Sequence, residues 1–372
     1  MSVARSKLEA HAIILAGGRG TRFWPRSRTR TPKQLLNIVG NDTMLEQTVA
    51  RLSSIFSPAR IWAVTNSEQA AAVRAQIPRA ARRHVLAEPV GRNTAAAVGL
   101  AAIHLLRESR NGDALLAILP ADHYIAQPEK YRRLVRAALR AAEVPGNLVV
   151  LGIPPTRPDT GFGYVERGEL TVRTSPHVYE VRRFTEKPAL PLARRYISSG
   201  RYYWNAGMFF SRASTFLAAL EKFLPATHAA LLRLADTIGT PRYAAALKRT
   251  YAKLSNISVD YGILEPATRT RSAEHVLVIP AEVGWSDIGS WAAVYELLAT
   301  MPGENVSAGP FRALEATGNF LWSPRKFIVA IGVRDLVLVE TPDALLLCPR
   351  GRAQDVGKIV KWLEERNLKQ LI

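Results

Sequence analysis

Short apolar runs alternate with alanine- and leucine-rich segments of helical length over the first 155 residues of this 372-residue chain. Strands are expected at 12–16, 60–65, 84–86, 114–119 and 148–153, with helices between them at 45–56, 68–76, 94–108 and 131–143. Strands that are separated by helices usually pair in parallel through right-handed crossovers. The alternation therefore predicts an α/β fold with a Rossmann-like, doubly wound, mainly parallel sheet, and ligands of such sheets bind at the carboxyl ends of the strands.

A different pattern begins at about residue 157. The segments "TGFGYVERGEL" and "VYEVRRFTEKP" are typical of hairpin strands with loops, which indicates an inserted substrate-binding subregion. Residues 301–318 are polar with Gly and Pro, four short β runs follow, and a helix is expected over 353–367. We therefore expect a large domain over residues 1–295 and a small β domain with a terminal helix over 296–372.

The segment "AIILAGGRGTRFWPRSRTRTPKQLL", residues 12–36, begins with the first expected strand. Gly17, Gly18 and Gly20 allow positive φ angles and a close approach of a ligand to the backbone. Arg22 and Lys33 add positive charge, so the segment is a candidate phosphate site. A glycine-rich turn without a ligand remains an alternative. The dinucleotide motif lacks its third glycine here, and the segment contains no P-loop.

The chain carries a net charge of +19, from 50 Lys and Arg against 31 Asp and Glu. The arginines are spread over the whole chain, so we expect most of this charge to be solvated, with arginines concentrated at one anion site and no nucleic-acid partner. The single cysteine, Cys348, excludes an internal disulfide and thiolate metal clusters. Apolar runs are far shorter than the roughly 18 to 20 residues of a membrane span, so we expect a cytoplasmic protein with no membrane partner.

Two aspartates follow expected strands. Asp122 lies in "LPADHYI" and Asp287 in "VGWSDIGSW". Two carboxylates that meet at one edge of the sheet would form a Mg²⁺ site, although either residue alone is also typical of a turn. We expect His123 to have a packing or hydrogen-bonding role rather than to act as a base. The spacing of the other histidines does not indicate a zinc or iron site.

Two further segments carry polar residues beside apolar ones. "FTEKP" places Glu186 next to Lys187, and "WNAGMFF" is interpreted as a turn at Asn205 before an apolar strand. Both segments are compatible with surface loops. They are equally compatible with a sugar phosphate site, in which Lys187 pairs with the phosphate and Glu186 and Asn205 bind hydroxyls.

Together these segments resemble the sugar-1-phosphate nucleotidylyltransferases, in order from residue 12 to about 362. The resemblance includes "AEPVGRNTAAAVGLAA", "GFGYVE", "VDYGILE" and "GVRDLVLVETPDALLLC" as well as the segments above. The Trp-Pro pair after the glycine loop, the Pro-Lys-Gln and the Glu-Pro-x-Gly-Arg-Asn-Thr segment are similar to the mannose-1-phosphate guanylyltransferase branch, also called GDP-mannose pyrophosphorylases.

The resemblance implies that mannose 1-phosphate attacks the α-phosphorus of GTP in line, giving GDP-mannose and pyrophosphate with Mg²⁺ as cofactor. It also divides the large domain into a nucleotide half, about 1–155, and a sugar-phosphate half, about 156–295. Arg22, Lys33, Asp122 and Asp287 would be catalytic. The implied sites are: the triphosphate at Gly17, Gly18, Gly20, Arg22 and Lys33; Mg²⁺ at Asp122 and Asp287; guanine and ribose at Glu88, Asn93 and the backbone around Ala16; the mannose phosphate at Gly163, Glu186, Lys187 and Asn205.

The end of the chain resembles the short left-handed β-helix of single-function relatives, which is often a dimer contact, so we expect a homodimer. Many relatives carry a fused isomerase with a histidine-rich metal site. This chain stops at Ile372 and has no such histidine cluster in its sequence, so we expect guanylyl transfer without isomerase activity.

Three other functions remain as alternatives. Within the family, the acceptor could be another sugar 1-phosphate of manno or heptose configuration. A nicotinamide dehydrogenase would require an intact G-x-G-x-x-G motif, which is absent. A nucleic-acid-binding regulator would owe its function to the net positive charge, and its binding would then depend steeply on salt.

Overall fold

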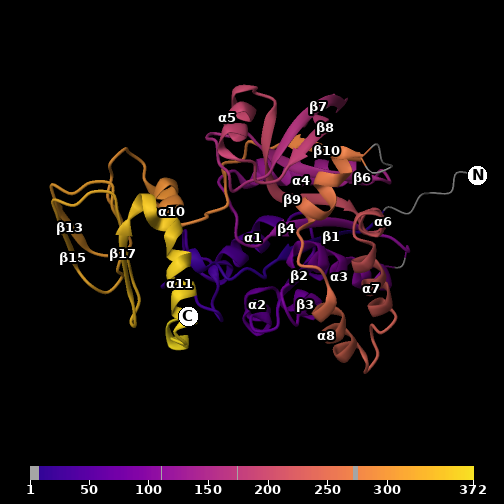
Figure 1. Cartoon of the computed structure of the whole chain (residues 1–372), viewed down its shortest axis with the longest axis horizontal. Coiled ribbons are helices and arrows are strands. Elements are labelled where there is room, and N and C mark those ends of the chain that lie inside the picture. Colours follow the sequence, from indigo (N-terminus) through magenta and orange to yellow (C-terminus); the bar gives the residue numbers. More distant parts are fainter. Residues whose placement is uncertain (1–7, 110, 174, 271–274) are drawn as a thin grey trace, which may run out of the picture.

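The computed structural model describes residues 8–109, 111–173, 175–270 and 275–372, and its centre is a nine-stranded sheet (Figure 1). Among the described strands, all but β9 and β8 run in the same direction. The order across the sheet is β3 (Val85–Glu88), β2 (Ile61–Asn66), β1 (Ala10–Leu15), β4 (Leu115–Pro120), β9 (Tyr202–Arg212), β6 (Asn147–Ile153), β10 (His275–Pro280), β8 (Val178–Thr185) and β7 (Tyr164–Val172).

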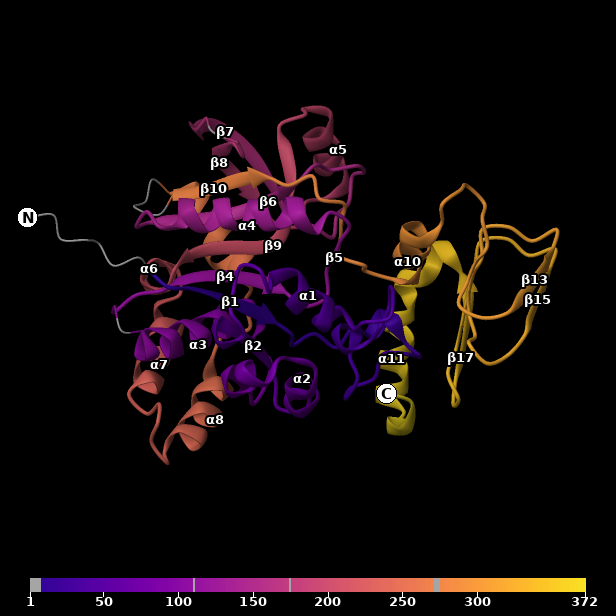
Figure 2. The ribbon, with the colours of Figure 1, turned by 180° about the vertical axis from the view of Figure 1, so that it is seen from behind.

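Helices cover both faces of this sheet, and Figures 1 and 2 show the two faces from opposite sides. One hydrophobic core lies beneath α1 (Met44–Leu52), α2 (Ala70–Gln76), α4 (Pro128–Ala142) and α5 (Leu190–Ser198). The opposite core lies beneath α3 (Asn93–Glu108), α6 (Ala213–Phe223), α7 (Pro225–Ala235), α8 (Tyr243–Lys253) and α9 (Glu265–Arg269). The doubly wound α/β fold is thus confirmed, and no helix among the described residues has the length and apolar character to cross a membrane.

The strand β9 corrects one sequence-based prediction. Asn205 was expected in a turn before an apolar strand, but it lies inside β9, which runs antiparallel between β4 and β6. The pairing of β9 with β6 shifts register beside Asn205, and Gly207 adopts a φ of 64°. The Asn-x-Gly sequence, which resembles a turn, therefore forms an irregularity within a strand.

The C-terminal unit consists of short strands stacked as in a β-helix. Its pairs β12–β14, β14–β16 and β13–β15 are parallel, and β17 closes the larger sheet in antiparallel orientation. The strands are β12 (Val306–Ser307), β13 (Phe311–Leu314), β14 (Phe320–Trp322), β15 (Ile328–Ile331), β16 (Leu336–Glu340) and β17 (Leu345–Pro349). The sequence did not predict β12 and β13, since residues 301–318 are polar.

The helices α10 (Trp291–Leu298) and α11 (Val356–Glu365) join this unit to the rest of the molecule. In both views, α11 lies between the short strands of the C-terminal unit and the segment that follows β1 (Figures 1 and 2). A third hydrophobic core combines Phe23 and Trp24 of that segment with Trp291, Phe320 and Val356. The predicted division near residue 295 stays a prediction, because this core spans it.

Candidate active site

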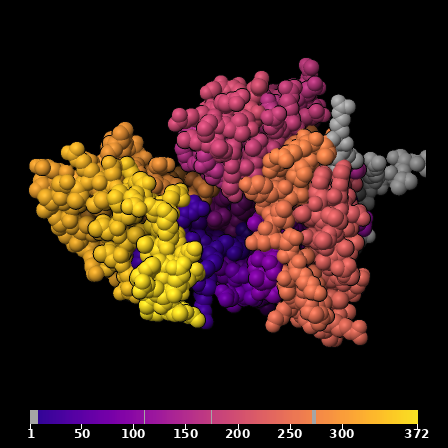
Figure 3. All heavy atoms as spheres, viewed as in Figure 1, coloured from indigo at the N-terminus to yellow at the C-terminus, as the bar shows by residue number. Residues whose placement is uncertain are grey.

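Loops that follow β1, β3 and β4 meet at one edge of the sheet, as the sequence predicted, and line a cavity of about 530 Å³. The space-filling view shows a deep hollow there, between α11 and the helices around α8 (Figure 3). The nucleotide half contributes Gly17, Gly18, Glu88, Asn93 and Pro120 to the wall, and the sugar-phosphate half contributes Gly163, Glu186, Asn205 and Asp260.

A second cavity of about 270 Å³ adjoins the first, and both are lined by His123 and Asp287. Its other walls include Gly20, Arg22, Lys33 and Asp122. All four residues predicted to be catalytic therefore surround one space.

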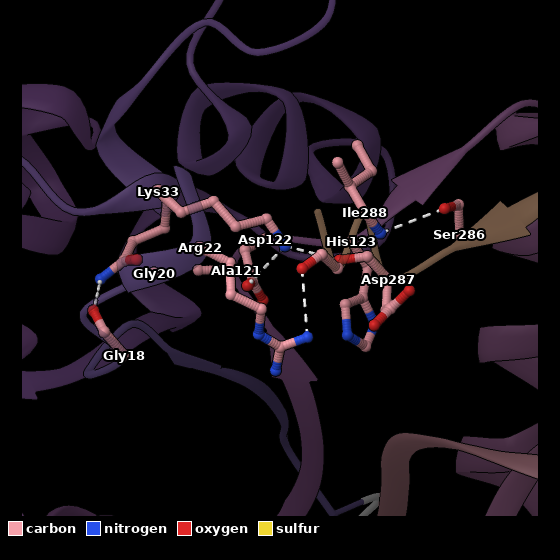
Figure 4. A network of polar contacts seen from close by, with 12 residues as sticks. Gly18, Gly20, Arg22, Lys33, Ala121, Asp122, His123, Ser286, Asp287 and Ile288 are labelled. Carbon is pink, nitrogen blue, oxygen red and sulfur yellow. Dashed lines mark hydrogen bonds and ion pairs between the residues drawn. The ribbon is translucent and has the colours of Figure 1, made fainter. Parts of the chain in front are cut away.

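Lys33 lines this second cavity and takes part in the network of polar contacts drawn in Figure 4. Its side chain is buried, and its ammonium donates to the Asp122 carboxylate over 2.9 Å and to the Asp287 backbone carbonyl over 2.5 Å. It thereby joins two segments that are far apart in the sequence. Gly20 makes room for Lys33, because a Cβ at Gly20, whose φ is 61°, would lie 2.4 Å from the Lys33 Cβ.

The two carboxylates have different electrostatic surroundings. Burial favours the neutral form of Asp122, but the charge and hydrogen bond of Lys33, together with His123 and a backbone hydrogen bond, hold the pKa of Asp122 below its ordinary value. Burial raises the pKa of Asp287, against the influence of Lys33 and with a further contribution from the negative charge of Asp122. A cation beside Asp287 would therefore stabilise its ionised form.

Arg22 lies in a short 3-10 helix, Thr21–Phe23, that directly follows the glycines. One guanidinium nitrogen, Nη1, donates to the Gly289 carbonyl over 3.1 Å and to the Gln354 side chain over 2.8 Å. A Cβ at Gly289 would lie 2.9 Å from an Asp287 carboxylate oxygen and 3.4 Å from Arg22 Nη1, so the Asp287 carboxylate would have to shift.

Glu88 ends β3 and faces the first cavity with a side chain that is almost fully buried. Burial raises its pKa to about 7, and Oε1 has no hydrogen-bond partner among the described residues. A buried acceptor without a partner is unfavourable unless a ligand provides a donor. Oε1 of Glu88 is therefore an acceptor that the described residues leave unsatisfied.

The neighbouring nucleotide residues take different positions. Asn93 begins α3 with a φ of 64° and lines the cavity, and its side chain accepts from the Thr94 backbone over 2.9 Å. Ala16 does not line the cavity: its carbonyl already accepts hydrogen bonds from Gln34 and from Thr65. Gly17 and Gly18 line the wall, so their backbone, rather than that of Ala16, is placed to contact a ligand in the cavity.

On the opposite wall, Gly163, Glu186 and Asn205 lie together as predicted. Asn205 donates to Asp260 over 2.6 Å, and a Cβ at Gly163 would lie 2.4 Å from a carboxylate oxygen of Glu186. Burial raises the pKa of Glu186, and the Asp260 carboxylate raises it further. Lys187 pairs with Glu186 over 3.1 Å but is half exposed and lies outside the wall.

Sequence reasoning missed Asp260 and Trp285. The segment "VDYGILE", which contains Asp260, supported the resemblance, but nothing in the sequence places its carboxylate beside Asn205. Trp285 donates to His123 Nδ1 over 3.1 Å, and burial lowers the pKa of His123 to about 4. The predicted hydrogen-bonding role of His123 is thus confirmed.

The donor set for a metal is small. Within the described part of the chain, no three or more His, Cys, Asp or Glu side chains gather where they could hold an ion. Asp122 and Asp287 are the two carboxylates among the described residues that line the second cavity.

Comparisons with known proteins match this architecture. Residues 11–302 match the family Nucleotidyl transferase, and residues 312–363 match the MannoseP isomerase/GMP-like beta-helix domain. The mannose-1-phosphate guanylyltransferase of Escherichia coli K12 is 36% identical over 366 residues, which are 97% of this chain and 74% of that protein. The alginate biosynthesis protein AlgA of Pseudomonas aeruginosa is 36% identical over 95% of this chain and 72% of its own length.

A solved structure with a similar fold agrees with these sequence matches. A crystal structure from Thermus thermophilus, described as that of a mannose-1-phosphate geranyltransferase, superposes with a TM-score of 0.85 and 36% identity, over 96% of this chain and 100% of that one. The fold, the site and these relatives lead to one conclusion: the chain belongs to the mannose-1-phosphate guanylyltransferases, a family of nucleotidyltransferases.

Proposed function

We propose that the enzyme transfers GMP from GTP to α-D-mannose 1-phosphate and releases GDP-mannose and pyrophosphate. The observation that carries the choice of GTP is Glu88, a carboxylate residue of the cavity wall whose buried Oε1 has no hydrogen-bond partner among the residues that the structure describes. An ionised carboxylate only accepts hydrogen bonds, and guanine presents two adjacent donors, N1–H and the 2-amino group. Adenine presents an acceptor at N1, which would face the carboxylate unfavourably.

The phosphates would lie over Gly17, Gly18 and Gly20, with Arg22 and Lys33 beside them. Negative charge increases on the leaving pyrophosphate as its bond to the α-phosphorus breaks, so cations placed there stabilise the transition state more than the bound substrate. Lys33 is buried and held from two sides, so its charge is already oriented before the reaction.

Asp122 and Asp287 are the residues that would hold Mg²⁺, whose preferred ligands are oxygens. Their fit rests on two facts: both line one cavity, and burial together with Asp122 raises the pKa of Asp287, which a cation would reverse. When bound, Mg²⁺ would neutralise charge on the phosphate oxygens during transfer.

The attacking group needs no general base in this proposal. A sugar phosphate, with a second pKa of about 6, is already largely ionised at neutral pH. His123 has a pKa of about 4 and accepts from Trp285, so it is neutral and already engaged. The chain's contribution is to align the sugar phosphate, held near Gly163, Glu186 and Asn205, with the α-phosphorus.

We also propose a cytoplasmic homodimer. Support for the dimer comes from an apolar surface on the β13–β15 sheet of the C-terminal unit, where Leu314, Val329 and Ile331 are between 57% and 62% exposed and Leu314 lies opposite Ile331. Such a surface is unfavourable in water unless it is covered. Sedimentation analysis of the purified chain tests this, and a monomer at micromolar concentration would contradict it.

The deciding experiment measures pyrophosphate release with four nucleoside triphosphates and several sugar 1-phosphates, with and without EDTA. We expect GTP with mannose 1-phosphate to be preferred by about 100-fold over mismatched pairs, the scale set by unpaired buried polar groups. EDTA should abolish turnover and added Mg²⁺ should restore it. Faster turnover of ATP or dTTP, or of a heptose 1-phosphate, would contradict the nucleotide or the sugar assignment.

A further inference from the structure

The arginines of the glycine loop contact the C-terminal unit. Four of them, within residues 19–28, each contact a different residue of the region 322–364. The contacts are Arg19 with Glu364 over 2.6 Å, Arg22 with Gln354 over 2.8 Å, Arg28 with Asp343 over 2.8 Å, and the Arg26 guanidinium over the Trp322 ring at 3.9 Å.

Side chains of the same segment also contact α11 and the residues that follow it. The Trp24 indole donates to the Leu371 carbonyl over 2.8 Å. Gly357 of α11 lies so close that a Cβ there would be 3.5 Å from the Thr21 hydroxyl and 3.6 Å from the Arg22 side chain. The C-terminal unit therefore reaches a residue of the second cavity, although its own sequence indicated no chemistry.

In the described part of the chain, the hydrogen bonds of Arg22 occupy one nitrogen of its guanidinium and leave the others open. Gly289 and Gln354 both accept from Nη1, so these bonds use the two hydrogens of one nitrogen. A guanidinium has five N–H groups, and none of the contacts at Arg22 in the described residues engages Nε or Nη2. That edge remains available for two parallel hydrogen bonds to a phosphate.

We propose that the C-terminal unit positions the active site within its own chain, and that Gln354 is the positioning residue that turns the free edge of Arg22 toward the phosphates. This inference rests on the proposed function in one respect, that the loop binds phosphates. Single exposed ion pairs such as Arg19 with Glu364 contribute little by themselves. The effect on the reaction comes from the orientation of Arg22, because small misplacements of a charge at the reacting group are costly.

The test is a double-mutant cycle of Gln354→Met and Arg22→Ala, measured as kcat and KM for GTP. Methionine keeps the length of the glutamine side chain but loses the acceptor. We expect Gln354→Met to lower kcat about tenfold with KM for GTP changed less than about twofold, since an orienting contact acts on the chemical step. In the Arg22→Ala background the same change should lower kcat less than about twofold, because Gln354 then has nothing to orient.

Arg352→Met is the matched control, on the same turn as Gln354. Arg352 is exposed and pairs with Asp355 rather than with a residue of the loop, so kcat of this variant should equal that of the wild type. Equal losses from Gln354→Met in both backgrounds would overturn the proposal, and so would wild-type kcat in the single variant.

The nucleotide and sugar assignments are tested separately. If the wild type prefers another nucleotide or sugar phosphate, the proposed substrates are wrong, and the cycle is measured with the preferred pair. Its outcome still decides the role of Gln354, because the loop would contact phosphates that all such substrates share.

Discussion

At the scale of single residues, the site depends on ionisable groups that the fold buries and then leaves partly unpaired. Lys33 is held between Asp122 and the Asp287 carbonyl, and Glu88 keeps one oxygen without a partner in the described structure. Burying such groups is unfavourable for folding. Their placement at two adjoining cavities is therefore best explained by what they do to a bound ligand, and Lys33 and Glu88 can be tested one at a time.

Lys33→Met should lower kcat by about 10²- to 10³-fold, the scale of losing one preorganised electrostatic contact. Methionine retains most of the packing of the buried stem, so the change removes mainly the charge. Steady-state kinetics with GTP as the varied substrate measures it, with Lys130→Met on α4, a partly exposed lysine paired with Glu282, as control. An increase in KM with unchanged kcat would make Lys33 a simple binding residue.

Glu88 should make guanine recognition depend on pH. With a pKa of about 7, it is mostly protonated at pH 6 and mostly ionised at pH 8, and only the ionised form accepts both guanine donors. The ratio of kcat/KM for GTP between the wild type and Glu88→Gln should rise about tenfold over this range, following the ionised fraction. The ratio cancels the titration of the phosphates, and a ratio that is flat with pH would refute the prediction.

The same group has a defined effect on stability. Its pKa is raised in the folded state, so ionising it costs the folded protein more than the unfolded chain, and stability falls as the pH rises from about 4.5 toward 7. The free energy of unfolding of Glu88→Gln minus that of the wild type should therefore be about 2–3 kcal/mol more positive at pH 8 than at pH 4.5. Urea titrations at both pH values measure this difference.

At the scale of secondary structure, the sequence predicted the strands and helices whose positions depend on local sequence patterns. The strands β1, β2, β3, β4 and β6 and the helices between them lie within a few residues of their predicted bounds. Their apolar runs and the glycines that end them are local signals. The edge of the sheet where the loops meet follows from the parallel pairing of these strands, so most of the predicted site residues could be placed together.

Long-range pairings could not be predicted. Asn205 lies in β9 because β9 pairs with both β4 and β6, and the signal in its own sequence is that of a turn. The Asn205 contact with Asp260 joins segments 55 residues apart. Likewise, Gln354 looks like an ordinary polar residue before a helix, and only the packing of α11 on the loop brings it to Arg22.

The strand pair β7–β8 leads to a prediction for the sugar side. Gly163→Ala, just before β7, would place a methyl 2.4 Å from a Glu186 carboxylate oxygen and 3.2 Å from the Phe184 ring, so Glu186 must move. We expect kcat/KM for mannose 1-phosphate to fall about tenfold or more, while KM for GTP stays within about twofold.

Gly351→Ala is the control for this change, since a Cβ there meets nothing within 4 Å. If Gly163→Ala lowered kcat/KM equally for mannose 1-phosphate and for GTP, the wall around Glu186 would not be specific to the sugar phosphate.

At the scale of the whole molecule, the third core makes the two ends of the chain depend on each other. Phe320 of the C-terminal unit is 1% exposed and stacks on Trp291 with ring centroids 5.5 Å apart. In the same core, Phe23 follows the glycine loop. The small β unit is therefore packed into the structure that carries the phosphate loop.

Phe320→Ala should lower the free energy of unfolding by about 3–5 kcal/mol, the usual cost of deleting a buried aromatic ring. Because the core is shared, we expect one cooperative transition in urea, with tryptophan fluorescence and activity lost together. Phe311→Ala, on a surface position of β13 that is 36% exposed, should cost far less. A separate early transition of the C-terminal unit would disprove the shared core.

The contacts between the arginine loop and the C-terminal unit also bear on how such chains can recombine. A crossover between two diverged relatives at almost any point from residue 29 to residue 321 would bring the arginines of one parent to the partners of the other. Residues 19–28 and 322–364 should therefore be inherited as a pair. A hybrid enzyme that exchanges only one of these two segments should fold, but its Arg22 should be wrongly oriented. Exchanging both segments should restore the orientation of Arg22.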